Sequence, residues 1–330
     1  MKNRISVLVV GGAGYIGSHM VKLLGSIGAD VTVLDNLSSG HKDAVLYGDL
    51  VVGDISDKNL ISRIIKSKNY DVVMHFASFI DVSESLRSPE IYYQNNLINT
   101  LNLLNVMKEE GVNKFIFSST AAIFGEPEYT PIDESHSKNP INPYGRSKYM
   151  IEQILSEYES AYGINYVCLR YFNAAGADPD GVLGERHKNE THLIPLILQA
   201  ASGRRDNISI FGSDYKTHDG TCIRDYIHVA DLCEAHLLGI KYLFDTDKSM
   251  NFNLGNGEGF SVREVIETAM KVTNINFNIL EEKRRPGDPA ILIADSSLAK
   301  TVLDWQPKYY NLDKIISDSW NFEKNFFVDK

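Results

Sequence analysis

VLVVGGAGYIGS, residues 7–18, is the stretch that decides the fold. Its first four residues are apolar without alternation, which is typical of a strand buried on both faces of a parallel sheet. Apolar residues at helical spacing follow the stretch as far as Ile27. A strand, a glycine-rich turn and a helix in this order predict a loop that holds a pyrophosphate at the helix N-terminus. The glycines of this loop are Gly11, Gly12, Gly14 and Gly17.

An acidic residue ends the next predicted strand. Residues 31–34 are mostly apolar and are followed by Asp35, which lies 18 residues after Gly17. A carboxylate at this place can accept hydrogen bonds from both hydroxyls of an adenosine ribose. It would repel a 2′-phosphate, and residues 36–38 contain no arginine to offset it. We therefore expect NAD, and not NADP, as the cofactor.

Length and charge restrict the class of protein. The chain has 330 residues, enough for two domains or one large α/β unit. Its hydrophobic content of 43% and charged content of 23% are typical of a soluble globular protein. The net charge of −10 argues against nucleic acid as a partner. An anionic substrate must then be met by locally placed arginines.

Cysteine and histidine usage predicts a reducing compartment and no metal. The three cysteines form no Cys-x-x-Cys pair, and the nine histidines are scattered and show no spacing typical of metal ligands. Lys2 and Arg4 precede an apolar run that is too short for a signal peptide. No run approaches the roughly 18 apolar residues of a membrane span. We expect a cytoplasmic protein that does not bind membranes.

Two later strand ends carry residues suited to a cofactor. Asp54 and Ile55 follow the apolar residues 50–52 and could hold an adenine, although Asp54 could equally cap the helix expected over residues 58–66. Ala77 and Ser78 follow the strand expected over residues 72–76, where small side chains leave room for a ligand. Asn95 and Asn96, on the helix expected over residues 89–110, could face the cofactor, a loop backbone or simply solvent.

Hydroxyl groups and a Tyr-x-x-x-Lys sequence supply candidate catalytic residues. The strand expected over residues 114–117 runs into two serines and Thr120, at an edge where open α/β sheets bind ligands. Tyr144 and Lys148 are four residues apart and lie on one face of a helix. A free tyrosine has a pKa of about 10, and a nearby ammonium group stabilises its phenolate. These three residues can remove a proton from an alcohol while its carbon loses a hydride.

The motifs together resemble the extended short-chain dehydrogenase/reductase family, and within it the branch that epimerises UDP-hexoses. The resemblance implies a Rossmann-like, doubly wound parallel sheet in an NAD-binding domain at residues 1–172. It also implies a smaller mixed α/β domain for the UDP-sugar at residues 173–330, with the chain passing between the two. The matching strings are GGAGYIGSH, LDNLSSGH, FIFSSTAAIFGE, NPYGRSK, LRYFNAAGADPDG, GTCIRDYIHVADL and RRPGDPA.

The implied activity is reversible, NAD-dependent 4-epimerisation of UDP-glucose and UDP-galactose through a 4-keto sugar. Such proteins pair the helices that match residues 89–110 and 148–162, which implies a homodimer. The expected cofactor-binding residues are Gly11, Gly14, Tyr15, Ile16, Gly17, Asp35, Asn36, Asp54, Ile55, Phe76, Ala77, Ser78, Asn95, Ser118, Tyr144, Lys148 and Phe172. The expected substrate-binding residues are Thr120, Tyr144, Asn173, Leu193, Ile210, Phe211, Arg224, Tyr226, Arg285, Asp288 and Ile291.

Within this set the resemblance assigns the diphosphate to Arg224 and Arg285, because a guanidinium binds phosphate oxygens in pairs. The alternative is that these arginines pair with acids close in sequence, such as Asp225 and Glu282. Ile291 stands where the family limits sugar size by a tyrosine or a much smaller residue. Its intermediate bulk leaves UDP-N-acetylhexosamines open as substrates.

Single positions also distinguish this chain from its relatives and bear on alternative functions. Thr120 replaces a serine of many relatives and keeps the hydroxyl, whereas Ile80 replaces a lysine that reaches the cofactor in some of them. A sugar 4,6-dehydratase needs an acid and a base where this chain has Ala121 and Ala122. UDP-uronates remain an alternative substrate class. An NAD-sensing regulator on the same fold is the non-enzyme alternative.

Overall fold

The computed structural model describes residues 4–285 and 287–328 and divides the chain into two compact units. Unit 1 extends to Gly125 and also includes Lys138–Arg170 and Cys233–Phe252. Unit 2 consists of Glu126–Ser137, Tyr171–Leu232 and the chain from Asn253 onward. Each unit therefore contains a segment that lies, in sequence, within the other.

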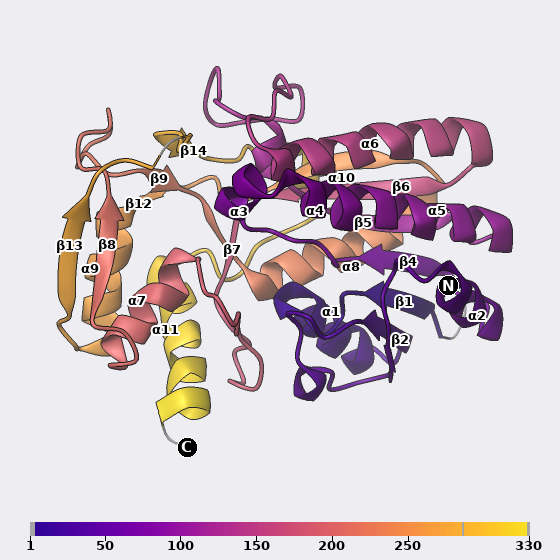
Figure 1. The fold of residues 1–330 in the computed structure, drawn as a ribbon, viewed down its shortest axis with the longest axis horizontal. Helices are drawn as coiled ribbons and strands as arrows, with labels where there is room; N and C mark the ends of the chain where they lie inside the picture. Colours follow the sequence, from indigo (N-terminus) through magenta and orange to yellow (C-terminus); the bar gives the residue numbers. More distant parts are fainter. Residues whose placement is uncertain (1–3, 286, 329–330) are drawn as a thin grey trace. The chain divides into compact units, whose positions relative to one another are not determined.

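Unit 1 is built on a parallel sheet that has seven strands among the described residues (Figure 1). Strand β1 lies between β2 and β4, with Val7 opposite Val31 on one side and Val72 on the other. The strand order reverses at this point, which confirms the predicted doubly wound, Rossmann-like fold. From edge to edge the strands are β11 (Met250–Leu254), β6 (Asn165–Tyr171), β5 (Lys114–Thr120), β4 (Val72–His75), β1 (Ser6–Val10), β2 (Asp30–Asp35) and β3 (Asp49–Val52).

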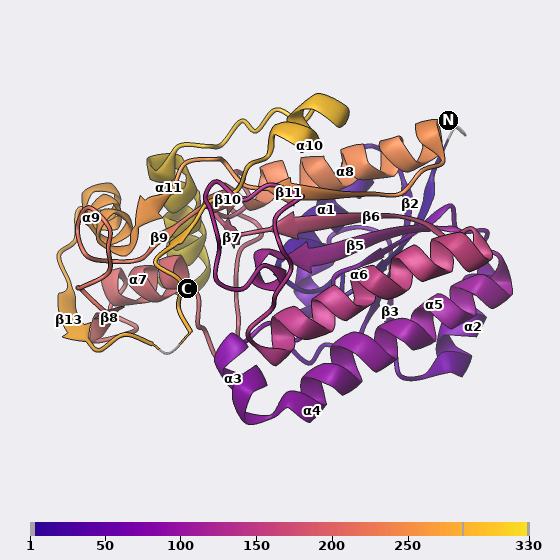
Figure 2. The ribbon, with the colours of Figure 1, turned by 90° about the horizontal axis from the view of Figure 1, so that it is seen from above.

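Helices cover both faces of this sheet. Figure 2 shows α8 (Val229–Thr246) on one side and α5 (Asn99–Glu110) and α6 (Pro143–Tyr162) on the other. Side chains on both faces of β1 are fully buried, which explains its run of apolar residues without alternation. The other helical segments of unit 1 are α1 (Tyr15–Ser26), α2 (Lys58–Ser67), α3 (Val82–Arg87), α4 (Pro89–Tyr92) and the short η1 (Lys42–Ala44) and η3 (Ala121–Ile123).

The helix expected over residues 89–110 is not uniform. Between α4 and α5 the chain forms a π-helical segment, η2 (Tyr93–Ile98). Asn96 within it is fully buried, and its amide group accepts a hydrogen bond from the backbone N–H of Phe79 and donates one to the Phe79 carbonyl. The wider turn thus places a polar side chain against a loop backbone, as π-segments often do beside functional sites.

Unit 2 combines short strands with helices and confirms the predicted smaller, mixed α/β part. β8 (Asn207–Phe211) pairs in parallel with β13 (Asn278–Glu282), and β7 (Asn173–Ala175) pairs with β10 (Tyr226–His228). The short β9 (Ile223–Arg224) lies between β12 (Phe260–Ser261) and β14 (Ile291–Leu292). The helical segments are α7 (Leu193–Ala201), α9 (Val262–Thr273), α10 (Ser297–Val302), α11 (Leu312–Glu323) and η4 (Lys324–Val328).

The core of unit 2 forms where α7, α9 and α11 pack together beside β8. Ile197, Val265 and Ile315, one from each helix, are fully buried in it. A capping box starts α9, in which Ser261 and Glu264 satisfy each other's backbone N–H groups. This core fixes the start of α7 and the end of β8, which carry several predicted substrate-binding residues.

Candidate active site

The glycine loop fits the pyrophosphate of a dinucleotide. A Cβ atom on Gly11 would lie 2.4 Å from the backbone nitrogen of Ala77, and one on Gly17 would lie 2.1 Å from the Gly11 carbonyl oxygen. Gly14 precedes α1 and offers no side-chain cap to its first N–H groups. Backbone donors and the positive end of the helix dipole therefore stay free for an anion. Tyr15 and Ile16 are the first residues of α1.

Asp35 ends β2 beside this loop. Its Oδ2 accepts a hydrogen bond from the N–H of Ala13 at 2.9 Å, and its Oδ1 accepts one from the N–H of Leu37 at 2.8 Å. These bonds fix the carboxylate between the glycine loop and the chain after β2. An ionised carboxylate has about four acceptor positions, so it can still accept hydrogen bonds from ribose hydroxyls.

Asn36 and Asp54 are connected after the ends of β2 and β3. The amide of Asn36 donates to Oδ2 of Asp54 at 2.6 Å. Although burial raises the pKa of Asp54, hydrogen bonds from Ser56 and Asn36 lower it overall. The alternative role of Asp54 as the cap of α2 is wrong, because Asp57 occupies that position and accepts from Leu60. Ile55 is buried next to Asp54.

The segment after β4 lies at the same sheet edge as the glycine loop. Phe76 donates its N–H to the Val10 carbonyl, and Ala77 is in close contact with Gly11. Ser78 accepts a hydrogen bond from Nζ of Lys148 at 2.6 Å. Asn95 is half-buried and donates to the Asn96 side chain. The expected cofactor-binding residues thus lie in unit 1, except Phe172, which belongs to unit 2.

The hydroxyl of Thr120 lies close enough to the phenol of Tyr144 to lower its pKa. Thr120 ends β5, and its hydroxyl oxygen accepts the N–H of Ala122 at 3.1 Å, which leaves its proton for another acceptor. Burial raises the pKa of Tyr144 above its usual value, and the Thr120 hydroxyl opposes this effect. A neighbour that lowers the pKa stabilises the phenolate, so Thr120 acts as a donor to it.

Gly145 allows this contact, and the sequence analysis did not identify it. A Cβ atom there would lie 2.4 Å from the carbonyl oxygen of Ala122. Helix α6 begins with Asn142 as its cap, which accepts from the N–H of Gly145. The missing side chain lets the first turn of α6 press against the residues after β5. Tyr144 is thereby brought to Thr120.

Lys148 is held in the interior by defined partners. Its Nζ donates to Oγ of Ser78 and, at 2.9 Å, to the carbonyl of Ser118. Burial lowers the pKa of Lys148 to about 7, while the charges of Cys168 and Glu152 act in the opposite direction. A lysine with this pKa exchanges its proton near neutral pH.

Glu152 continues the face of α6 that carries Tyr144 and Lys148, and it too was missed. Its carboxylate accepts from Oγ of Ser119 at 2.5 Å and forms a two-pronged ion pair with Arg170. Both charged side chains are almost fully buried. The i, i+4, i+8 spacing of Tyr144, Lys148 and Glu152 is a sequence signal that could have found it.

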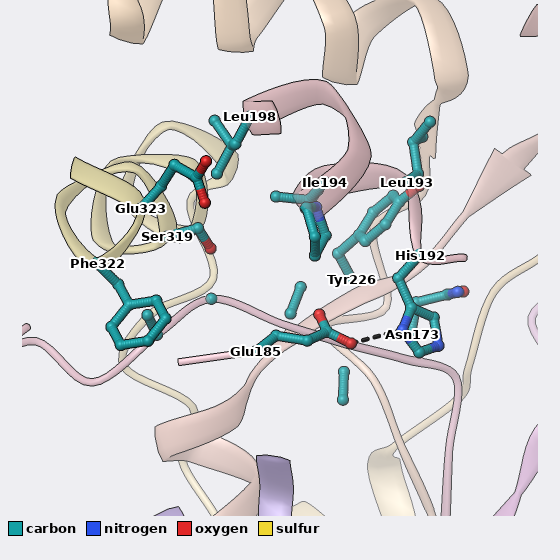
Figure 3. Close-up of a pocket in the computed structure, with 15 residues that line it drawn as sticks. Asn173, Glu185, His192, Leu193, Ile194, Leu198, Tyr226, Ser319, Phe322 and Glu323 are labelled. Carbon is teal, nitrogen blue, oxygen red and sulfur yellow. Dashed lines mark ion pairs between the residues drawn. The ribbon is translucent and has the colours of Figure 1, made fainter. Parts of the chain in front are cut away.

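In unit 2, three predicted substrate-binding residues line one pocket (Figure 3). Asn173 and Tyr226 lie opposite each other on β7 and β10, and Leu193 starts α7. The N–H of Asn173 donates to the carbonyl of Asp225. Glu185 and His192 also line this pocket.

The remaining predicted residues of unit 2 form two contacts of their own. The guanidinium of Arg285 lies 3.8 Å from the ring centre of Phe211, which ends β8 after Ile210. Arg224 forms an ion pair with Asp288 at 2.5 Å. The expected alternative partner Asp225 is instead buried and accepts from the N–H groups of Asn256, Gly257 and Ala294. Ile291 starts β14 and lies opposite Ile223.

In the described part of the chain, no helix combines the length and the apolar character needed to cross a bilayer. The fold and the glycine loop define the class: a nucleotide-binding α/β protein of the Rossmann type. Residues 7–255 match the model of the NAD dependent epimerase/dehydratase family, and the chain belongs to this family.

Individual relatives resemble the chain over almost its whole length. The UDP-glucose 4-epimerase of Halalkalibacterium halodurans is 51% identical over 320 residues, 97% of this chain and 96% of the relative. The solved UDP-glucose 4-epimerase of Brucella ovis in complex with NAD is 46% identical, with a TM-score of 0.94 and coverage of 96% and 97%. That of Bifidobacterium longum, in complex with NAD⁺ and UDP, is 38% identical, with a TM-score of 0.91 and coverage of 97% and 98%.

Proposed function

We propose that this protein interconverts UDP-glucose and UDP-galactose by reversible, NAD-dependent epimerisation at C4 of the sugar, through a 4-keto intermediate. The closeness of the Thr120 hydroxyl to the Tyr144 phenol, whose pKa it lowers, is the observation that carries the proposal. It places a phenol and a hydroxyl together at the carboxyl end of β5, in the unit that contains the glycine loop. Ligands of open α/β sheets bind at this edge.

Tyr144 is the residue that moves the proton. As a phenolate it takes the proton of the C4 hydroxyl, and as a phenol it returns the proton after the sugar has turned over. Thr120 donates to the same phenol oxygen and orients the substrate oxygen beside it. The chemistry that bound NAD supplies is the acceptance and return of a hydride at C4.

Lys148 supports the phenolate as a positive charge on the same helix face. Its hydrogen bonds to Ser78 and Ser118 fix the position of the ammonium group at the ends of β4 and β5. A cation in a poorly solvated place favours the ionised form of a nearby phenol. In the proposed mechanism, the ammonium group of Lys148 stabilises the phenolate form of Tyr144.

Unit 2 binds the UDP moiety in this proposal. Arg285 and Arg224 hold the diphosphate, and Phe211 and Ile210 lie along the uracil. Arg224 already pairs with Asp288, so a bound diphosphate would share or replace that partner. Both arginines lie at the diphosphate and not at the hexose in this proposal. The nucleotide end of the substrate is therefore held firmly while the hexose turns over.

A dehydratase or a regulator fits the same residues less well. Ala121 and Ala122, in η3, supply neither the acid nor the base that 4,6-elimination needs. A regulator that only senses NAD gains nothing from a buried lysine and a phenol beside the Thr120 hydroxyl. The epimerase is the function that uses both.

The quaternary structure and location that we propose are a cytoplasmic homodimer. The outer surfaces of η2 and α6 expose apolar side chains, among them Ile98 and Tyr162. The three cysteines are free and buried, as suits a reducing compartment. Light scattering at micromolar concentration should give twice the mass of one chain, and the mass of one chain would contradict the dimer.

The function is tested with purified protein and UDP-galactose, without added NAD, by chromatography of the products. We expect UDP-glucose to form with the cofactor that the protein retains. Tyr144→Phe should abolish the conversion, and Tyr149→Phe, on the same helix, should not. No conversion by the wild type, even with NAD supplied, would overturn the assignment. A parallel reaction with UDP-N-acetylgalactosamine reports whether Ile291 admits an acetamido group.

A further inference from the structure

A cluster of two histidines and two glutamates lies outside the residues used above. Glu185, His187, Glu190 and His192 belong to the loop between β7 and α7, and one ligand atom from each lies within 4.8 Å of all the others. The carboxylates of both glutamates are almost fully buried. Both histidines point the same ring nitrogen, Nδ1, towards the carboxylates.

Three of the four nitrogen–oxygen distances in the cluster are close to those between ligands of one small cation, and the fourth, between His192 and Glu185, is shorter. Zinc lies about 2.0–2.2 Å from nitrogen and oxygen ligands, so a tetrahedral site separates its ligands by roughly 3.3 Å. Nδ1 of His187 lies 3.1 Å from Glu185 and 3.4 Å from Glu190. Nδ1 of His192 lies 3.3 Å from Glu190 and 2.5 Å from Glu185.

Two of these atoms, Oε1 of Glu185 and Nδ1 of His192, are buried and have no partner among the described residues outside the cluster. They lie 2.5 Å apart, and the dashed line in Figure 3 joins them. The Glu185 side chain is only 6% exposed. Because buried polar groups need partners, the cluster must satisfy these atoms from within, either by ion pairs or by a cation that they share.

Glu190 is already positioned as a ligand would be. Its Oε1 accepts hydrogen bonds from the N–H groups of Thr191 and His192, at 2.8 and 2.9 Å. These bonds hold the carboxylate in place and leave Oε2 facing His187. Ligating carboxylates are commonly oriented by hydrogen bonds of this kind.

We propose that Glu185, His187, Glu190 and His192 bind one Zn²⁺ ion. Two neutral imidazoles and two carboxylates balance the charge of a divalent cation. Imidazole is a ligand of zinc and its neighbours in the transition series, whereas calcium and magnesium prefer oxygen. The sequence predicts no metal because the i, i+2, i+5, i+7 spacing of these residues is not typical of a zinc motif.

The ion would fasten the loop to the start of α7. His192 is the N-cap residue of α7, directly before Leu193, and its side chain makes no capping hydrogen bond. Gly184, before Glu185, lies against Phe322 of α11 without room for a Cβ atom. A metal that joins Glu185 to His192 would fix both ends of this segment. The site depends only on these side chains and stands whether or not the protein is an epimerase.

The competing interpretation is a set of ion pairs without metal. Although burial lowers it, Glu185 and Glu190 raise the pKa of His187 to about 9, so protonated imidazoles could also neutralise the carboxylates. Metal binding and ion pairing differ in an observable way, because only the former responds to chelators and to added Zn²⁺.

The test uses the full chain, purified without a histidine tag, incubated with Zn²⁺ and dialysed before its zinc content is measured. We expect one Zn²⁺ per chain in the wild type and roughly tenfold less in Glu185→Gln and His187→Gln. His218→Gln is the matched control, because His218 is exposed and lies 3.5 Å from Glu264, outside the cluster. It should keep the zinc content of the wild type.

Thermal unfolding of the wild type provides a readout that needs no variant to fold. A chelator should lower Tm by about 5 °C, and Zn²⁺, but not Mg²⁺, should restore it. A wild type that holds no zinc after incubation, with Tm unaffected by chelator and Zn²⁺, would overturn the proposal in favour of ion pairs. Equal loss of zinc in His218→Gln would also overturn it, because the ion would then lie elsewhere.

Discussion

At the scale of single residues, Tyr144 has conflicting requirements. In the proposed mechanism it must lose its proton near neutral pH, yet burial raises its pKa. Thr120 opposes this effect directly, because its hydroxyl can donate to the phenolate form of Tyr144 while its oxygen accepts the N–H of Ala122. The threonine therefore does more than orient a substrate: it sets part of the acidity of the phenol.

Replacing Thr120 by valine removes a donor to the phenolate while keeping the shape of the side chain. The pKa of Tyr144 should rise, so the acidic limb of the kcat–pH profile should move to higher pH. Thr120→Ser keeps the hydroxyl and should leave the limb in place. Initial rates of UDP-glucose formation between pH 6 and 10 measure the shift. A limb that stays in place in the valine variant would show that Thr120 does not affect this proton.

At the scale of elements, helix α6 carries the candidate catalytic residues and their buried acidic neighbour on one face. Tyr144, Lys148 and Glu152 follow one another at intervals of four residues, and the last is fixed by Arg170 and Ser119. The first turn can approach β5 only because Gly145 has no side chain. The geometry of the site is therefore a property of the contact between a helix and a strand end.

Gly145→Ala should move the first turn of α6 away from the residues that follow β5. A new Cβ atom 2.4 Å from the backbone oxygen of Ala122 must displace α6, and overpacking of this kind costs about 1–3 kcal/mol of stability. Displacing Tyr144 from Thr120 should lower kcat by about 100-fold. Arg146→Ala, at the exposed next position, should change neither quantity greatly. Steady-state kinetics and Tm measure both, and a kcat close to that of the wild type would contradict the role of Gly145.

Elements with a regular pattern could be predicted from the sequence, and contacts that depend on distant segments could not. The continuous apolar run of residues 7–10 predicts a buried strand, and in the structure both faces of this strand are covered. The π-helical segment at Tyr93–Ile98 was missed, and within it Asn96 is hydrogen-bonded to Phe79, a contact with a distant part of the chain that no local pattern marks. Gly145 was missed for the same reason, since its neighbour Ala122 precedes it by 23 residues.

At the scale of the whole molecule, the two units exchange segments that no local pattern marks. Glu126–Ser137 belongs to unit 2, where Ile132 forms a bridge with Ala294. Cys233–Phe252 returns to unit 1, where Gly239 contacts Val167. The family resemblance indicated that the chain passes between two domains but not where. The assignment of NAD to unit 1 and the UDP-sugar to unit 2 stays a prediction.

Buried basic groups make the stability of the molecule depend on pH. His75 is fully buried in the central sheet and hydrogen-bonds Thr100 through Nε2 at 2.7 Å. The Thr100 hydroxyl donates to the Asn96 carbonyl, so the histidine is the donor, and its Nδ1 has no partner among the described residues. Burial lowers the pKa of His75 to about 3, and the charge of Lys148 acts in the same direction. A proton on this ring therefore has no favourable place in the folded protein.

The free energy of unfolding should consequently fall as the pH decreases from 6.5 towards 3, because the unfolded chain binds one more proton at His75 than the folded chain. His75→Gln keeps a donor for Thr100 but cannot titrate, so the difference in stability between wild type and variant should change by about 1.4 kcal/mol per pH unit in this window. Urea unfolding of both proteins at pH 4.5, 5.5 and 6.5 measures this difference. A difference that is constant across the three pH values would show that His75 keeps an ordinary pKa in the folded state.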